Sequence, residues 1–159
     1  MPIYMKFEGI KGGVTTGKYA GWIELESCQL GVHRSVTNAT GRGTNREATT
    51  PSVSEIVVTK YQDISSADLF KASLWGEGKK VTIDFVKSDK DGLNTYLTIE
   101  LENTLVSSYS ISGGGIDRPM ESLSLNFIKI TFSTQPKDPP AKPSPSQTRA
   151  TWDLQTAKP

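Results

Sequence analysis

The sequence has very few residues of the kinds that build redox, metal or acid–base sites. Its 159 residues include one cysteine, Cys28, and one histidine, His33. A lone cysteine excludes a disulfide within the chain and a zinc site built from cysteines. We therefore expect a protein that folds in the cytoplasm and holds no metal or other cofactor.

The chain also lacks an excess of either charge and any long hydrophobic run. Lysine and arginine total 18 against 17 acidic residues, so its long-range field is weak and favours neither nucleic acid nor an anionic membrane as partner. No stretch is long enough to span a bilayer, and Met1–Lys6 is not a basic leader before an apolar block. We expect no membrane insertion, no signal peptide and no export by the general secretory route.

What is present points to an all-β fold. The chain is 35% hydrophobic and has the length of one domain. Apolar residues alternate with polar ones in several short runs, for example Ile3, Met5 and Phe7, which is the period of a strand with one buried face.

Two changes of phase and one overlong strand suggest how the strands are arranged. The apolar set changes from odd to even positions near Ser27 and again after Phe127, and such slips are typical of β-bulges. Between Leu97 and Ile111 apolar residues recur at odd positions, interrupted in phase only by Asn103 and Ser107, so we expect one face of this strand to stay apolar throughout. The run exceeds the usual strand length, so the strand should bend or pass between sheets. Together these features predict a small closed or nearly closed barrel.

One short helix interrupts the strands. Ser65 and Ser66 offer an N-cap, and Gly76 offers a stop, so the pattern predicts a helix over 67–75. Its apolar stripe is wide, and we expect the helix to pack against the sheets. The stripe contains Leu69, Phe70, Ala72, Leu74 and Trp75.

Near the end of the chain, proline divides the sequence. The segment 135–147 contains five prolines, which remove backbone donors and prevent ladder pairing. Beyond it, Ala150, Trp152 and Leu154 alternate again. We expect a barrel over 1–134, a linker over 135–147 and a terminal strand within 148–159 that docks on the barrel edge.

Residues that resemble catalytic motifs have simpler explanations. The segment 12–18 begins like a phosphate-binding P-loop, but Tyr19 stands where Mg²⁺ needs Ser or Thr and a strand follows where a helix is required. A glycine-rich hairpin accounts for it better. The pairs Glu24 with Glu26 and Glu100 with Glu102 alternate with apolar residues, as on the solvated face of a strand. His33 has no identifiable carboxylate partner, so we expect no catalytic residues and no enzyme.

Several runs of residues are informative as whole stretches of sequence: 1–12, 21–25, 51–60, 78–85, 101–107, 121–127 and 152–154. In this order along the chain they resemble the Hcp (haemolysin-coregulated protein) family of the bacterial type VI secretion system. The resemblance covers nearly the whole chain.

The resemblance implies a β-barrel of two sheets with one flanking helix, six copies of which close into a ring with a wide central channel. Rings would stack into a tube that a contracting sheath propels, that carries the VgrG spike and that holds small effectors in its lumen. Such a protein would be cytoplasmic before firing and then secreted into the medium or a target cell.

The polar segment 33–52 is our candidate for contact with the next ring. Loops of this length are usually functional or disordered, and this one carries both signs of charge. The candidate stacking residues are Arg34, Arg42, Arg46 and Glu47. Any single arginine here could equally be solvated surface.

A second class of function stays open at this point. A small secreted ligand-binding or adhesin barrel would use an enclosed pocket in place of an open ring. An effector enzyme fused to a tube domain comes third, because no residues are left beyond the barrel for a catalytic domain.

Overall fold

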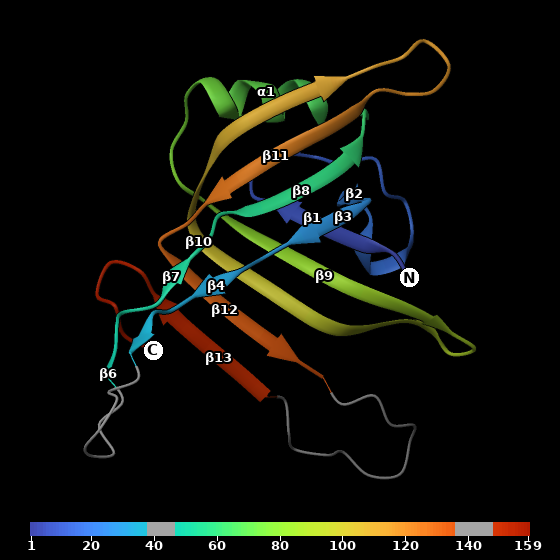
Figure 1. Ribbon diagram of the computed structural model, residues 1–159. Coiled ribbons are helices and arrows are strands. Elements are labelled where there is room, and N and C mark those ends of the chain that lie inside the picture. Colours follow the sequence, from blue (N-terminus) through green and yellow to red (C-terminus); the bar gives the residue numbers. More distant parts are fainter. Residues whose placement is uncertain (38–46, 136–147) are drawn as a thin grey trace.

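The computed structural model describes residues 1–37, 47–135 and 148–159, and Figure 1 shows their arrangement. These residues form thirteen strands, one α-helix and one short 3-10 helix. The first elements are β1 (Ile3–Phe7), η1 (Gly17–Tyr19), β2 (Ile23–Leu25), β3 (Ser27–Gln29), β4 (Val32–His33), β5 (Val36–Thr37), β6 (Glu47–Ala48) and β7 (Ser52–Val53). The others are β8 (Ile56–Tyr61), α1 (Ser66–Leu74), β9 (Lys79–Asp89), β10 (Gly92–Ser112), β11 (Met120–Asn126), β12 (Lys129–Thr134) and β13 (Thr148–Asp153).

Two antiparallel sheets share the 21-residue strand β10 (Figure 1). The first half of β10 lies between β9 and β12, which gives a first sheet in the order β2-β1-β9-β10-β12-β13. Its second half pairs with β11, which gives a second sheet in the order β10-β11-β8-β3. The predicted mainly-β fold of two sheets with one helix is confirmed. The barrel is not closed, because β3 pairs with neither β2 nor β13 in the part of the chain that the structure describes.

The strand β10 changes its buried face where it passes between the sheets. Ile99 and Leu101 are buried, then Asn103 adopts a positive φ of 52°, and from there Thr104 and Val106 are the buried residues. The pairing with β9 shifts register at the same place, between Leu101 and Thr104. The expected passage between sheets is therefore confirmed.

The expectation of one unbroken apolar face on this strand is wrong. After the turn at Asn103, Leu105 is 46% exposed, and at the end of the strand Ile111 is 53% exposed. A shift of one residue moves every side chain to the opposite face of a sheet.

The two phase slips in the sequence mark places where the chain changes sheet. After β2 the chain leaves β1 and begins to pair with β8 at Ser27. After β11, at Phe127 and Ile128, it leaves the second sheet and pairs with the first half of β10. Each slip was predicted to be a bulge, and each is instead a strand end, with the same effect of turning the side chains over.

The space between the sheets holds one main hydrophobic core. Both sheets contribute fully buried residues, and α1 contributes Leu69. Cys28 packs against this core from β3, and burial raises the pKa of its thiol to about 11. A smaller cluster around Tyr19 fills the space beneath the loop 12–22. The core residues with no exposed surface include Met5, Ile23, Ile56, Val58, Val81, Ile83, Leu101, Leu123 and Leu125.

The loop 12–22 is a hairpin-like turn and not a phosphate-binding loop. The N–H of Gly12 donates to the carbonyl of Gly21, and the N–H of Val14 donates to the carbonyl of Trp22. A Cβ at Gly12 would lie 2.1 Å from the carbonyl oxygen of Trp22, so only glycine fits this close approach. The Tyr19 hydroxyl donates to Asp84 at 3.0 Å and anchors the loop on β9.

The helix begins one residue earlier than predicted and packs through one side only. Leu69 has no exposed surface, whereas Phe70, Leu74 and Trp75 are 51%, 59% and 65% exposed. The helix packs against the sheets as expected, through Leu69 and Ala72, but the rest of its apolar stripe stays exposed. Nine residues give the helix two and a half turns, too few for a stripe this wide to meet the sheet everywhere.

After the segment 136–147, which lies outside the described residues, the chain forms β13. All six residues of β13 pair with β12, from Thr134 opposite Thr148 to Lys129 opposite Asp153. Trp152 packs against the main core, which holds this edge strand in place. The division of the chain at residues 134 and 147 stays a prediction.

Candidate assembly surfaces

The described parts of the segment predicted to contact a next ring, 33–37 and 47–52, form a two-stranded ribbon that leaves the sheets (Figure 1). Its base is the β4–β7 pair, with Val32 opposite Val53, and it continues as the β5–β6 pair. Between these pairs the N–H of Thr49 donates to the carbonyl of Ser35 at 3.0 Å, and the N–H of Ser35 donates to the Thr49 hydroxyl. The ribbon is therefore a hydrogen-bonded extension of the two sheets.

The structure places only part of the predicted stacking set. Arg34 is exposed and lies between β4 and β5, and Glu47 begins β6. Arg42 and Arg46 lie outside the described residues, so the four residues are not seen together. His33 is an exposed strand residue opposite Ser52.

An apolar groove of about 390 Å³ lies where the ribbon meets the end of the first sheet. We call it the ribbon groove. No charged residue lines it among the residues that the structure describes, and two of its apolar residues, Val32 and Phe132, are 64% and 36% exposed. Its lining residues are Leu30, Val32, Pro51, Val53, Ile130, Phe132, Ala150, Thr151 and Trp152.

A second apolar surface lies at α1, at the opposite end of the molecule (Figure 1). We call it the helix end, and it consists of Phe70, Leu74, Trp75 and Leu105. Phe70 meets Tyr109 of β10 edge to face, with ring centroids 5.6 Å apart. The Lys71 ammonium lies 5.9 Å from the ring centroid of Trp75. Large exposed apolar residues gathered in this way are typical of interaction surfaces.

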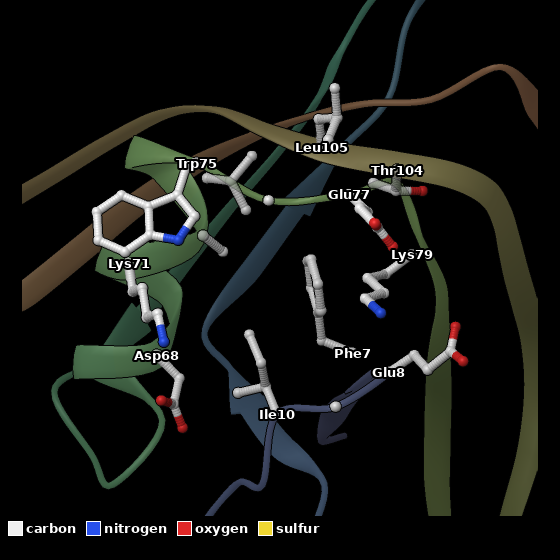
Figure 2. A pocket seen from close by; sticks show the side chains of 14 residues that line it. Phe7, Glu8, Ile10, Asp68, Lys71, Trp75, Glu77, Lys79, Thr104 and Leu105 are labelled. Carbon is white, nitrogen blue, oxygen red and sulfur yellow. The ribbon is translucent and has the colours of Figure 1, made fainter.

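A cavity of about 320 Å³ opens beside the helix end (Figure 2). Phe7 and Ile10 line it, together with Trp75, which directly follows α1, and Leu105 of β10. Three acidic and two basic residues also line it, so it carries a small negative charge. The charged lining residues are Glu8, Asp68, Glu77, Lys71 and Lys79.

A buried polar network fixes the other end of α1. The side chains of Lys60 on β8 and Glu121 on β11 have no exposed surface and form an ion pair. The Lys60 ammonium also donates to Asp63 at 2.9 Å, and the Ser66 hydroxyl at the start of α1 donates to Glu121 at 2.8 Å.

The Tyr109 hydroxyl donates a further hydrogen bond to Glu121. Burial, and then this bond to the carboxylate, raise the pKa of Tyr109 well above its usual value. A buried charge is tolerated only when it is paired and hydrogen-bonded, and each member of this network is.

The carboxylate pairs from the sequence lie on the exposed or partly exposed faces of their strands. Glu24, Glu26 and Glu102 are exposed, and Glu100 lies 3.7 Å from Lys80 in a surface ion pair. Within the described ranges, no three His, Cys, Asp or Glu residues lie close enough together to hold a metal ion. No helix in the same ranges has the length and apolar character needed to cross a membrane.

Sequence reasoning missed three features of the folded chain: the buried Lys60–Glu121 pair, the ribbon groove and the helix end. The Lys60–Glu121 pair joins residues 61 apart, and nothing in either local pattern indicates that they meet. The ribbon groove combines β4, β7, β12 and β13, so it exists only in the folded chain. The helix end had a signal in its wide apolar stripe, which exceeds what a short helix can bury.

Comparisons with known proteins agree on one family. The profile of the family described as "Type VI secretion system effector, Hcp" matches residues 4–133. Protein hcp1 of Pseudomonas aeruginosa is 37% identical over 89 residues, which are 54% of each chain. The aligned part therefore spans about half the length of this curated relative.

Solved structures extend the likeness to the whole fold. A structure described as that of a type six secretion system protein is 26% identical, with a TM-score of 0.88 over 99% of this chain and 98% of that chain. Hcp1 from Salmonella typhimurium has the same fold at 23% identity, with a TM-score of 0.77 over 98% of this chain and 95% of that chain. Because the family profile covers most of the sequence and these structures share its sheets, the chain belongs to the Hcp family of the type VI secretion system.

Proposed function

We propose that this chain is a structural subunit of a tube, in which rings of six copies stack around a central channel. The observation that supports this most directly is the pair of exposed apolar surfaces at opposite ends of one small body. A protein that stays monomeric rarely exposes such surfaces. Membership in the Hcp family supplies the kind of assembly in which they would be covered.

The test is the size and shape of the purified protein. Size-exclusion chromatography with light scattering should give six times the mass of one chain, and averaged end-on electron micrographs should show a ring with an opening. A stable monomer at high concentration would instead support the ligand-binding barrel. Reproducible hydrolase activity of the purified chain would contradict a purely structural role.

We further propose that the ribbon contributes to contact between stacked rings through Arg34, Arg42, Arg46 and Glu47. Arg34 is exposed on a ribbon that reaches beyond the sheets, as a contact with a neighbouring ring requires. Deleting about ten residues within 41–51 should leave ring formation intact and weaken stacking. Tubes of unchanged length from this deletion, seen by electron microscopy, would contradict the assignment.

The partners and the location follow from the same role. We propose that the tube carries a VgrG spike, is propelled by a contractile sheath and holds small effectors in its channel. The chain would then be cytoplasmic until the apparatus fires and extracellular afterwards. Its release into the medium should stop when the sheath genes are deleted, and release that continues without the sheath would contradict this route.

A further inference from the structure

We propose that the ring is closed by a head-to-tail contact, in which the helix end of one copy fits into the ribbon groove of the next. The inference rests on the ring proposed above and names the two surfaces that would form it. Each of the two surfaces would be covered by a second copy of this chain.

The chemistry of the two surfaces matches. The helix end presents Trp75, which is 65% exposed, together with Leu74 and Phe70. The ribbon groove is concave and lined by apolar residues and one threonine. An aromatic side chain that fills an apolar pocket is the usual anchor of a protein interface.

The charges around the two surfaces are opposite in sign. Beside the helix end, acidic residues outnumber basic ones by one, and Asp68 and Glu77 are both exposed. Beside the ribbon groove, Arg34 and Arg149 are exposed, while Asp153 accepts hydrogen bonds from the N–H groups of residues 155 and 156. Opposite charges around an apolar contact set its orientation and disfavour contact between two identical ends.

The positions of the surfaces select a ring over a two-fold dimer. A two-fold axis brings the same patch of both copies together, and here that would leave two grooves or two helix ends facing each other. Unlike surfaces at opposite ends of the body join head to tail, and such a contact closes into a ring when its rotation divides a full turn.

Two substitutions break the contact from either side. Trp75→Glu alters only the helix end, and Val32→Glu alters only the groove, and both side chains are mostly exposed in the single chain. We expect each variant to fold with an unchanged circular dichroism spectrum. Loss of an aromatic anchor should raise the concentration needed for assembly by at least about 30-fold, so that monomers predominate.

Ile116→Glu is the matched control. Ile116 is fully exposed in the segment between β10 and β11, away from both surfaces, and the substitution makes the same change from apolar to acidic. This variant should form rings like the unchanged protein.

Mixing the two broken variants gives the sharpest test. Each retains the surface that the other has lost, so one intact contact is possible between them. The mixture of Trp75→Glu and Val32→Glu should form dimers with one copy of each variant and no rings, whereas each variant alone should stay monomeric. A contact between identical surfaces predicts no mixed dimer.

The outcomes separate this inference from the proposed function. If the unchanged protein forms rings and Trp75→Glu or Val32→Glu forms them equally well, the contact is wrong while the ring stands. If either variant forms rings that fail to stack, the surface belongs between rings and the inference is also overturned. If the unchanged protein forms no ring, the proposed function itself fails.

Discussion

The two ends of helix α1 differ in which groups are buried beside them and which are exposed. At its N-terminal end, Lys60, Glu121 and the Ser66 hydroxyl are joined in a network in which neither charge is exposed. At its C-terminal end, Leu74 and Trp75 lie largely in solvent. Buried charged groups of β8 and β11 thus meet one end of this short helix, and exposed apolar groups gather at the other.

The difference separates what holds the single chain together from what is left for a partner. The network satisfies all its groups within the chain, and it ties α1 to β8 and β11. The apolar residues at the other end gain little from folding alone, because they stay in contact with water. We therefore expect substitutions at the first end to change stability and substitutions at the second to change assembly.

The largest loss of stability should follow Lys60→Met. It leaves the Glu121 carboxylate buried without its counterion, which should lower the free energy of unfolding by about 3–5 kcal/mol. Urea denaturation at low protein concentration measures this without a contribution from association. The double variant Lys60→Met with Glu121→Leu removes both charges and should recover at least half of the loss. A single variant as stable as the unchanged protein would show that the pair is dispensable.

Tyr109→Phe should have a smaller effect at the same end. It removes one hydrogen bond to the buried Glu121 carboxylate and keeps the ring that packs against Phe70. Bonds to charged groups contribute about 1.5–3 kcal/mol, and Lys60 still neutralises the carboxylate, so we expect a loss near the lower value. Denaturant midpoints measure the loss, and Tyr96→Phe is the control because Tyr96 lies elsewhere, next to Phe85. Equal midpoints for Tyr109→Phe and the unchanged protein would contradict a role for this hydroxyl.

Trp75→Ser should change the stability of the single chain by less than about 0.5 kcal/mol. Trp75 caps α1 through its backbone N–H, which donates to the carbonyl of Lys71 and which serine keeps. Its side chain is exposed, and the nearby Lys71 ammonium adds little in solvent. Thermal unfolding in the Val32→Glu background, which we expect to be monomeric, isolates this effect. A loss above about 1.5 kcal/mol would mean that Trp75 belongs to the fold and not to a contact surface.

The smallest effect concerns Glu55, an exposed carboxylate that contrasts with the buried Glu121. Hydrogen bonds from the Asn126 amide and then from the Ser107 hydroxyl lower the pKa of Glu55 below its ordinary value of 4.5. The folded pKa is the lower one, so this contribution to stability is present above pH 4.5 and is lost as the pH falls through the folded pKa. Asn126→Ala should raise the pKa of Glu55, as followed by NMR titration of its carboxyl carbon. An unchanged pKa would show that the amide does not hold the carboxylate.

Much of the fold could be predicted because the signals are local. Alternation identifies strands, and the phase slips at Ser27 and after Phe127 mark the two places where the chain changes sheet. The prediction of an unbroken apolar face along β10 was wrong because Asn103 adopts a left-handed conformation. Asparagine tolerates that conformation without requiring it, so the sequence does not reveal the turn.

The assembly surfaces were less predictable, because they depend on which residues meet in space. Arg34 lies on the ribbon and Arg42 and Arg46 lie outside the described residues, so the stacking role of these residues stays a prediction. The groove and the buried Lys60–Glu121 pair each combine strands far apart in the chain. Only the width of the α1 apolar stripe could have indicated a surface left for a partner.

The account depends most on whether copies of this chain join side by side into a closed ring. The most direct measurement is the mass of the unchanged protein in solution by light scattering, followed by end-on electron microscopy of the same fraction. We predict six chain masses and a round particle with a central opening. A single chain mass that persists as the concentration rises, or a dimer without an opening, would contradict it.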